Sequence, residues 1–352
     1  MTASRPAEKL EKLLRTIESE LQEVHARLWR THGRDAERLA RRVGGWLHPH
    51  HAARYIELLG LQEALKHFKT DHTKIMTTIR VNTLKADVEE VKESLEAKNF
   101  KVERHPYIGY GLVIKHAPIS PGATREYMRG LYTIQGPASM LAVPAMEPEK
   151  LPGEPRIADQ CAGAGVKTTQ ISQHRPDSAI AAIDINRRKL RALRNNAQRL
   201  AASNIAAYHM DGRQLDSLGA FDAVLLDAPC SGEGLTPFPK GQWPRSFDDI
   251  RGRVRLQAEL LAAAYRALKP GGTLVYATCS LSVEENEYLL TRILQAFEGL
   301  EPQRNPLQHG LPGITSYAGI QLDPRLRDAC RRFYPHIHHT EGFTICRLAK
   351  KG

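Results

Sequence analysis

Cysteine is scarce in this sequence, and long apolar runs are absent. Only 5 of the 352 residues are cysteine, and no two of them form a C-x-x-C pair, so we expect no disulfide framework. No stretch approaches the roughly 20 apolar residues that a membrane span requires, and the N-terminal MTASRPAEKL contains no apolar secretion signal. These absences predict a cytoplasmic protein without a membrane partner, whose thiols stay reduced and available for chemistry.

Acidic residues are outnumbered by basic ones. Fifty Lys and Arg against 39 Asp and Glu give a net charge of +11 and a pI near 9.5. A polyanionic partner suits this surplus, because each neutralised phosphate releases condensed counterions. The alternative is a solvated basic surface without a partner. A hydrophobic content of 41% is that of an ordinary globular enzyme, which we expect to be monomeric.

The first 75 residues have the periodicity of helices. Between Leu10 and Leu28 apolar side chains recur every three to four residues, which predicts a one-sided helix that docks on its own protein. A second helix is expected over Ala52–Phe68. We therefore expect residues 1–75 to form a helical N-terminal extension.

Residues 76–129 have a mixed pattern. A helix through Lys98 is expected to start at Asp87, with Glu90 completing a capping box. The strands expected around it are Thr78–Leu84, Phe100–Glu103 and Leu112–Lys115. This pattern predicts a small α+β unit, which is a candidate RNA-contacting module beside a basic domain, although its composition fits a structural role equally.

From residue 130 to residue 352 strands and helices alternate, which indicates a mostly parallel sheet covered on both faces. The expected strands are Arg156–Asp159, Ala179–Asp184, Ala206–Met210, Ala223–Asp227 and Thr273–Cys279, and the expected helices are Thr168–Gln173, Arg187–Leu200 and Val254–Leu268. Lys269-Pro-Gly-Gly272 is a turn signal after the last helix. Pro302–Pro312 and Pro324–Pro335 are rich in turn residues and are expected to be loops near the active face.

Each of the five expected strands ends at, or is directly followed by, an aspartate or a cysteine. These residues are Asp159, Asp184, Asp211, Asp227 and Cys279. In an open parallel sheet the carboxyl ends of the strands form one rim, where ligands bind. With Cys230 just past the fourth strand, the sequence predicts four carboxylates and two thiols on this rim, which packing alone does not explain.

A glycine-containing loop follows the first of these strands. It comprises Cys161, Ala162, Gly163, Ala164, Gly165, Val166 and Lys167, and Asp184 follows Gly165 by 19 residues. Glycine allows close backbone approach at a strand-to-helix turn, and an acid at that distance can accept hydrogen bonds from ribose hydroxyls. The pattern indicates a nucleotide-type cofactor, but NAD sites share it, and many such turns carry glycine for structural reasons.

Cys230 and Cys279 suit one particular reaction. Carbon 5 of cytosine is a poor nucleophile, and addition of a thiolate to carbon 6 makes it enamine-like, so that it can attack a methyl sulfonium. The C5 proton must then leave and the thiol must be expelled, which gives a second rim group a task. Asp227 can contact the cytosine N3 and amino edge and hold the charge that develops there.

Two other interpretations of the cysteines remain. They can be buried small hydrophobes, as free cysteine often is. They can also form a metal site with Cys161, but neither a nearby histidine nor paired spacing supports one, so we expect no metal.

Five motifs in this order resemble the Nol/Nop/Sun family of RNA (cytosine-5) methyltransferases from about Met76 to the C-terminus. They are Arg80–Lys85 (RVNTLK), Gln135–Ser139 (QGPAS), Asp227–Gly234 (DAPCSGEG), Tyr276–Leu281 (YATCSL) and Glu284–Glu287 (EENE). The resemblance implies a class I methyltransferase fold that is Rossmann-like, with S-adenosylmethionine as cofactor and a cytosine of tRNA or rRNA as substrate. It implies that Cys279 is the nucleophile and that Cys230 assists product release. It also implies that the segment Cys161–Lys167, with Asp184, Asp211 and Asp227, lines the cofactor site.

The glycine loop departs from the family pattern, which usually reads Ala-Pro-Gly-Gly-Lys-Thr. Here Ala164 replaces the proline and Val166 replaces a glycine. Valine is costly where a positive φ is required. We expect Gly163 to restore the lost freedom, as in a more general methyltransferase G-x-G turn.

Competing functions are a DNA or protein methyltransferase of the same fold, a non-catalytic RNA-binding or ribosome-assembly protein with a relic cofactor loop, and an NAD-dependent oxidoreductase. The paired cysteine motifs argue against a DNA or protein methyltransferase. Only Val166 supports a non-catalytic RNA-binding protein. An oxidoreductase would give neither Cys230 nor Cys279 a function.

Overall fold

The computed structural model describes residues 4–71, 75–235 and 246–352. Residues 1–3 and 72–74 of the expected N-terminal extension lie outside the described residues. The helices are α1 (Ser4–Arg42), α2 (Pro49–Phe68), α3 (Val88–Glu96), α4 (Arg125–Met128), α5 (Val166–His174), α6 (Arg187–Leu200), α7 (Phe247–Ala267), α8 (Leu289–Ala296), α9 (Leu326–Ala329) and α10 (Pro335–His338). Within the described ranges, no helix is both long and apolar enough to cross a membrane.

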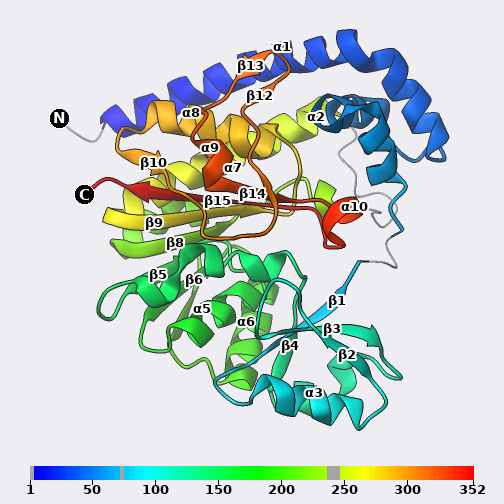
Figure 1. Cartoon of the computed structure of the whole chain (residues 1–352). Coiled ribbons are helices and arrows are strands. Elements are labelled where there is room, and N and C mark those ends of the chain that lie inside the picture. Colours follow the sequence, from blue (N-terminus) through cyan, green and yellow to red (C-terminus); the bar gives the residue numbers. More distant parts are fainter. Residues whose placement is uncertain (1–3, 72–74, 236–245) are drawn as a thin grey trace.

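A nine-stranded sheet forms the centre of the molecule (Figure 1), in the order β11-β14-β15-β9-β8-β5-β6-β7, with β10 beside β15. Its strands are β5 (Arg156–Asp159), β6 (Ala179–Asp184), β7 (Ile205–His209), β8 (Phe221–Asp227), β9 (Leu268–Thr278), β10 (Leu300–Pro302), β11 (Leu311–Pro312), β14 (Cys330–Phe333) and β15 (Phe343–Lys350). The pairings among β5 to β9 are parallel, and the others are antiparallel. This arrangement confirms the predicted Rossmann-like α/β fold.

Both faces of this sheet are covered, which is why β6 and β8 are almost continuously apolar. On one face, inward residues such as Val224, Leu226 and Leu274 join a core that contains α1, α7 and α8. On the other face, Leu225 and Val275 pack against α5 and the segment before β5. Figure 1 shows α1 lying across the outside of the first layer.

Helix α1 docks on its own chain, as its periodicity predicted. Leu13, Ile17, Leu21, Val24 and Leu28 are buried in the core of the large sheet. The helix is longer than expected and reaches Arg42. The first part of α1 is therefore part of the main core, whereas the end of α1 and α2 form a separate cluster with Leu281 and Tyr334.

A second sheet of four strands, in the order β2-β3-β1-β4, forms the small α+β unit. Its strands are β1 (Thr77–Val81), β2 (Lys101–Arg104), β3 (Gly111–His116) and β4 (Tyr132–Ile134). Asp87 and Glu90 form the predicted capping box at the start of α3. Strand β4 pairs with β1 although it follows residue 129. A separate two-stranded ribbon consists of β12 (Ser316–Tyr317) and β13 (Ile320–Gln321).

Three sequence-based expectations need correction. Helix α7 ends at Ala267, directly before the turn signal Lys269–Gly272, as predicted, but β9 already begins at Leu268, and its register with β8 shifts across these residues. The segments expected as loops over Pro302–Pro312 and Pro324–Pro335 contain β11, α9 and β14.

The third correction concerns the thiols. Cys330 and Cys346 stand directly opposite each other in the β14–β15 pair, with Cα atoms 4.1 Å apart, and form a disulfide. The antiparallel register creates this proximity, and sequence spacing does not reveal it. Cys161, Cys230 and Cys279 are free.

Candidate active site

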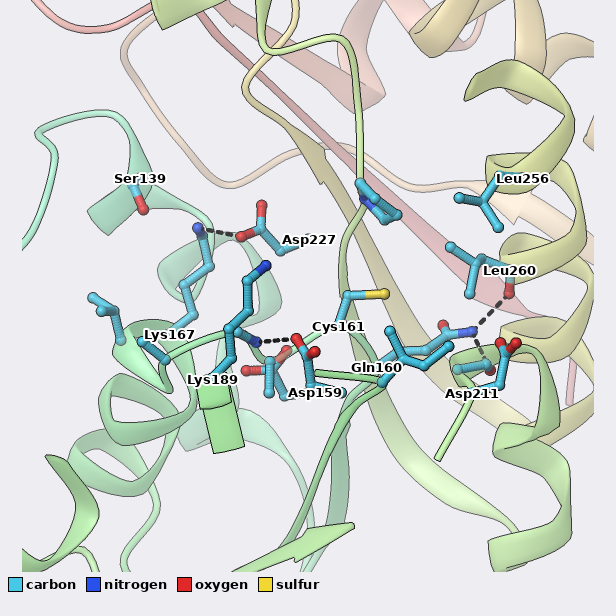
Figure 2. A pocket seen from close by; sticks show the side chains of 18 of the residues that line it. Ser139, Asp159, Gln160, Cys161, Lys167, Lys189, Asp211, Asp227, Leu256 and Leu260 are labelled. Atoms are coloured by element: carbon cyan, nitrogen blue, oxygen red, sulfur yellow. Dashed lines mark hydrogen bonds and ion pairs between the residues drawn. The ribbon is translucent and has the colours of Figure 1, made fainter. Parts of the chain in front are cut away.

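A cavity of 680 Å³ opens at the carboxyl ends of β5, β6 and β8. Figure 2 shows Cys161 near its middle, with Lys167 and Asp227 on one side and Leu256 and Leu260 of α7 on the other. Its other lining residues come from the ends of the parallel strands and from the segment before β5; they are Ile134, Gln135, Gly136, Ser139, Asp159, Gln160, Ala162, Gly163, Ala164, Val166, Asp184, Ile185, Lys189, Asp211, Gly212, Arg213 and Pro229. Most of the residues predicted for the cofactor site therefore lie around one cavity.

The two glycines of the loop have different surroundings. Both have a positive φ, +57° at Gly163 and +79° at Gly165. A Cβ at Gly163 would meet no atom within 4 Å, whereas one at Gly165 would lie 2.6 Å from Leu193 Cγ. Gly163 thus leaves room on the cavity side, while Gly165 allows the loop to pack against α6 and does not line the cavity.

Val166 is the first residue of α5 and is not among the described residues with positive φ. The left-handed positions of the turn are occupied by Gly163 and Gly165, as in the G-x-G alternative. Valine therefore carries no left-handed strain here.

Two rim acids, Asp184 and Asp211, are held by hydrogen bonds from residues beside them. Asp184 accepts hydrogen bonds from the backbone N–H groups of Gly163, at 2.9 Å, and Asn186, at 2.7 Å. Asp211 caps the turn Gly212–Leu218 and forms a 2.7 Å ion pair with Arg213. Each carboxylate oxygen can accept more than one hydrogen bond, so Asp184, with one on each oxygen, keeps acceptor capacity for a ligand, whereas both oxygens of Asp211 are already bound by Arg213.

Asp159 is the buried acid of the cavity. One of its oxygens accepts a 2.6 Å hydrogen bond from Thr168, and the other has no partner within the described part of the chain. Burial, reinforced by the negative charge of Asp227, raises the pKa of Asp159 to about 7, although the Thr168 hydrogen bond opposes this.

Lys167 and Asp227 form a 2.6 Å ion pair at the edge of the cavity. Although burial lowers the pKa of Lys167, the charge of Asp227 raises it above its ordinary value. The lysine therefore stays protonated and fixes the Asp227 carboxylate in place.

The two rim thiols lie side by side. Cys230 follows β8, Cys279 follows the neighbouring strand β9, and their Sγ atoms are 3.2 Å apart. The contact with Cys279 and burial both raise the pKa of Cys230 well above its ordinary value. Neither cysteine lines the 680 Å³ cavity, but Asp227 and Pro229, which do, immediately precede Cys230. Among the described residues, no cluster of His, Cys, Asp or Glu could hold a metal ion.

Two family models match the chain. Residues 146–349 match the 16S rRNA methyltransferase RsmB/F model, and residues 51–119 match the ferredoxin-like domain of RsmF/B-like methyltransferases. The chain belongs to the RsmB/F methyltransferase family. This membership confirms the resemblance to Nol/Nop/Sun enzymes.

Curated relatives of this family are similar over most of the chain. The mouse "28S rRNA (cytosine-C(5))-methyltransferase" is 35% identical over 85% of this chain and 38% of its own length. "Ribosomal RNA small subunit methyltransferase F" of Klebsiella pneumoniae is 36% identical over 78% of this chain and 57% of its own. The chain thus spans well under two thirds of these relatives.

Solved structures of similar length also match. A methyltransferase homolog protein from Pyrococcus horikoshii is 35% identical, with a TM-score of 0.78 over 89% of this chain and 97% of its own. NSun6 from Pyrococcus horikoshii with SFG is 26% identical, with a TM-score of 0.72 over 85% of this chain and 97% of its own.

Several residues of this family member's site were not predicted. Ile185 is 68% exposed at the cavity, and an apolar residue directly after Asp184 was the available signal. Gln160 donates hydrogen bonds to the carbonyl oxygens of Gly212 and Leu260 and so ties β5 to α7. No local sequence pattern distinguishes Gln160, Leu256 or Leu260, because α7 approaches the rim only in the folded chain.

Proposed function

We propose that this protein is an S-adenosylmethionine-dependent RNA (cytosine-5) methyltransferase that acts through a covalent adduct on Cys279. The observation that carries this proposal is the 3.2 Å approach of the Cys230 and Cys279 sulfurs at the ends of adjacent strands. The nearby 680 Å³ cavity supplies a site for the methyl donor. For this chemistry both sulfurs must be thiols, as they are in the structure.

The cavity residues fit S-adenosylmethionine. Asp184 would accept hydrogen bonds from the ribose hydroxyls, Asp211 would lie at the adenine edge, and the exposed Ile185 with Leu256 and Leu260 provides apolar surface for a base. The open space at Gly163 accommodates a close ligand. When bound, this cofactor supplies an electrophilic methyl group.

The chain's own residues would handle the cytosine. Cys279, as thiolate, adds to carbon 6, and the electron pair of the C5–C6 double bond moves toward the N3 edge, where Asp227 would contact the ring and the protonated Lys167 would balance the developing negative charge. Lys167 holds Asp227 in place through its ion pair. After carbon 5 is methylated, a water molecule takes up the C5 proton, those electrons form the C5–C6 double bond, and Cys279 leaves as a thiolate that accepts a hydrogen bond from the neutral Cys230 thiol.

RNA as the substrate is supported by the surface of α6. This helix has no acidic residue, and Arg187, Arg188, Lys189, Arg191 and Arg194 are all exposed. Within the described ranges none of the five is paired with a carboxylate. The exposed Lys85 of the small unit donates hydrogen bonds to the carbonyl oxygens of Arg129 and of Arg199 in α6. The small unit therefore lies directly beside the end of this basic helix. The relatives described above are rRNA methyltransferases, which favours rRNA over tRNA as the substrate.

The two thiols make the mechanism testable. Cys279→Ala should abolish methylation and any covalent RNA adduct, whereas Cys230→Ala should leave an RNA-linked band on a denaturing gel because elimination stalls. If the two cysteines served only to pack the core, both variants would lose stability and activity together. A trapped band with Cys279→Ala and none with Cys230→Ala would overturn the assignment.

The substrate class is tested by tritium transfer from labelled cofactor to RNA, DNA and protein, with Cys279→Ala as the inactive control. Label in cytosine of RNA alone supports the proposal. Label in DNA or protein, or none in any substrate despite cofactor binding, contradicts it.

A further inference from the structure

Arg54 of α2 is a buried arginine far from the cysteines in sequence. Its side chain is 3% exposed. Its Nη1 donates to Glu233 at 2.6 Å, and its Nε and Nη2 donate to Glu284 at 2.8 and 3.1 Å. A further 2.6 Å hydrogen bond runs from Nη2 to Ser282. All of these acceptors belong to the two segments that follow Cys230 and Cys279.

We name these segments the first cysteine loop (residues 228–235) and the second cysteine loop (residues 279–287). Glu233 lies three residues after Cys230, and Glu284 lies five residues after Cys279. The guanidinium of Arg54 thus connects the two loops. Helix α2, which precedes the small unit, thereby contributes to the geometry around both thiols.

Two further contacts join the cysteine loops. Glu285 accepts hydrogen bonds from Ser231, at 2.8 Å from its backbone N–H and 2.5 Å from its hydroxyl, and from the Ser280 hydroxyl at 2.6 Å. The Gly234 N–H donates to the Cys279 carbonyl at 3.0 Å. Ser231 and Ser280 each adjoin a cysteine, so a movement of either loop would change the 3.2 Å distance between the Cys230 and Cys279 sulfurs.

Arg54 makes the largest contribution to balancing the charges of Glu233 and Glu284, beside His51 at Glu233 and His25 at Glu284. Glu233 and Glu284 are both fully buried, and two like charges this close to one guanidinium repel each other without it. Although burial raises the pKa of Glu233, the charge of Arg54 holds it at about 2. The same balance lowers the pKa of Glu284. Removal of Arg54 would leave two buried carboxylates poorly neutralised and drive the loops apart.

We infer that Arg54 is a positioning residue that sets the separation of Cys230 from Cys279 and thereby the rate at which the methylated RNA adduct is released. This inference rests on the proposed function. The sensitive step is elimination, in which the Cys230 thiol must stay beside the Cys279 sulfur while the Cys279–C6 bond breaks. The methyl-donor cavity does not include Arg54, Glu233 or Glu284, so cofactor binding should be independent of it.

The test compares Arg54→Met with Arg54→Lys, Cys230→Ala and a matched control, Arg175→Met. Arg175 is also buried and donates to the carbonyl oxygens of Pro148, Leu151 and Gly153, away from both cysteine loops. For each variant we would measure the fraction of RNA-linked protein on a denaturing gel, multiple-turnover methylation, cofactor affinity and melting temperature.

In Arg54→Met we expect the RNA-linked band to persist as in Cys230→Ala, turnover to fall about a hundredfold as is typical of an ångström-scale misplacement, and cofactor affinity to stay unchanged. Arg175→Met should lose stability without accumulating the band. Arg54→Lys keeps the positive charge but loses the planar guanidinium that bonds both glutamates at once. The amount of RNA-linked protein and the turnover of this variant should therefore lie between those of the wild type and Arg54→Met. It replaces Arg54→Met in the test if that variant does not fold.

Two results would overturn the inference. If Cys230→Ala traps the adduct but neither Arg54 variant does, Arg54 is only structural. If Cys230→Ala itself leaves no band, the proposed mechanism fails, and the positioning role fails with it.

Discussion

Replacing Asp184 tests the cofactor site most directly. Its carboxylate adjoins the cavity and already accepts from the N–H groups of Gly163 and Asn186. We propose that it also accepts from two ribose hydroxyls, and a hydrogen bond to a charged group contributes about 1.5–3 kcal/mol. Asp184→Ala should therefore weaken S-adenosylmethionine binding by at least about 3 kcal/mol, which is roughly two orders of magnitude in Kd.

Isothermal titration of the purified variant measures this change. The matched control is Asn186→Ala, because Asn186 caps α6 through Arg188 and Lys189 without lining the cavity. Loss of this cap should cost about 1 kcal/mol of unfolding free energy and leave the cofactor affinity near that of the wild type. An Asp184→Ala protein that binds the cofactor within twofold of the wild type would place the ribose elsewhere.

Two further predictions concern charge. The salt dependence of RNA binding, measured as the slope of log K against log salt concentration, should become shallower by about 2–3 in the α6 triple variant Arg187→Gln/Arg191→Gln/Arg194→Gln. The control triple variant on the exposed side of α1, Arg30→Gln/Arg34→Gln/Arg41→Gln, should change the slope less. Equal slopes for the two variants would mean that the basic residues of α6 do not contact RNA phosphates. Because the folded pKa of Asp159 is raised from 3.8 to about 7, the folded state binds the proton more tightly, so unfolding free energy should fall as pH rises from about 4 to 7, by up to about 4 kcal/mol. Urea unfolding at pH 5 and pH 8 should show this fall in the wild type and lose it in Asp159→Asn; an unchanged pH dependence in the variant would contradict the assignment.

The parallel part of the fold was readable from sequence because its signals are local. Strands β5 and β6 and helix α6 begin and end at the predicted residues, since each is an uninterrupted apolar run or a capped amphipathic helix. The rim acids followed from where these strands stop. The antiparallel strands β14 and β15 were missed, because arginine and cysteine interrupt their apolar pattern.

The buried acids show where local reasoning fails. Glu284, Glu285 and Glu287 have the composition of an exposed segment, yet all are fully buried. Their burial depends on partners far along the chain, such as Arg54 for Glu284 and Arg332 for Glu287. The disulfide of Cys330 and Cys346 likewise depends on a register that only the folded sheet defines.

The position of β15 has a consequence for synthesis of the protein. Strand β15 lies between β9 and β14 rather than at an edge of the sheet. Until residues 343–350 leave the ribosome, β9 has an unpaired side, and β14 cannot join the rest of the sheet. Such open strand edges favour association with other chains, so nascent chains that stall before residue 343 should depend on chaperones.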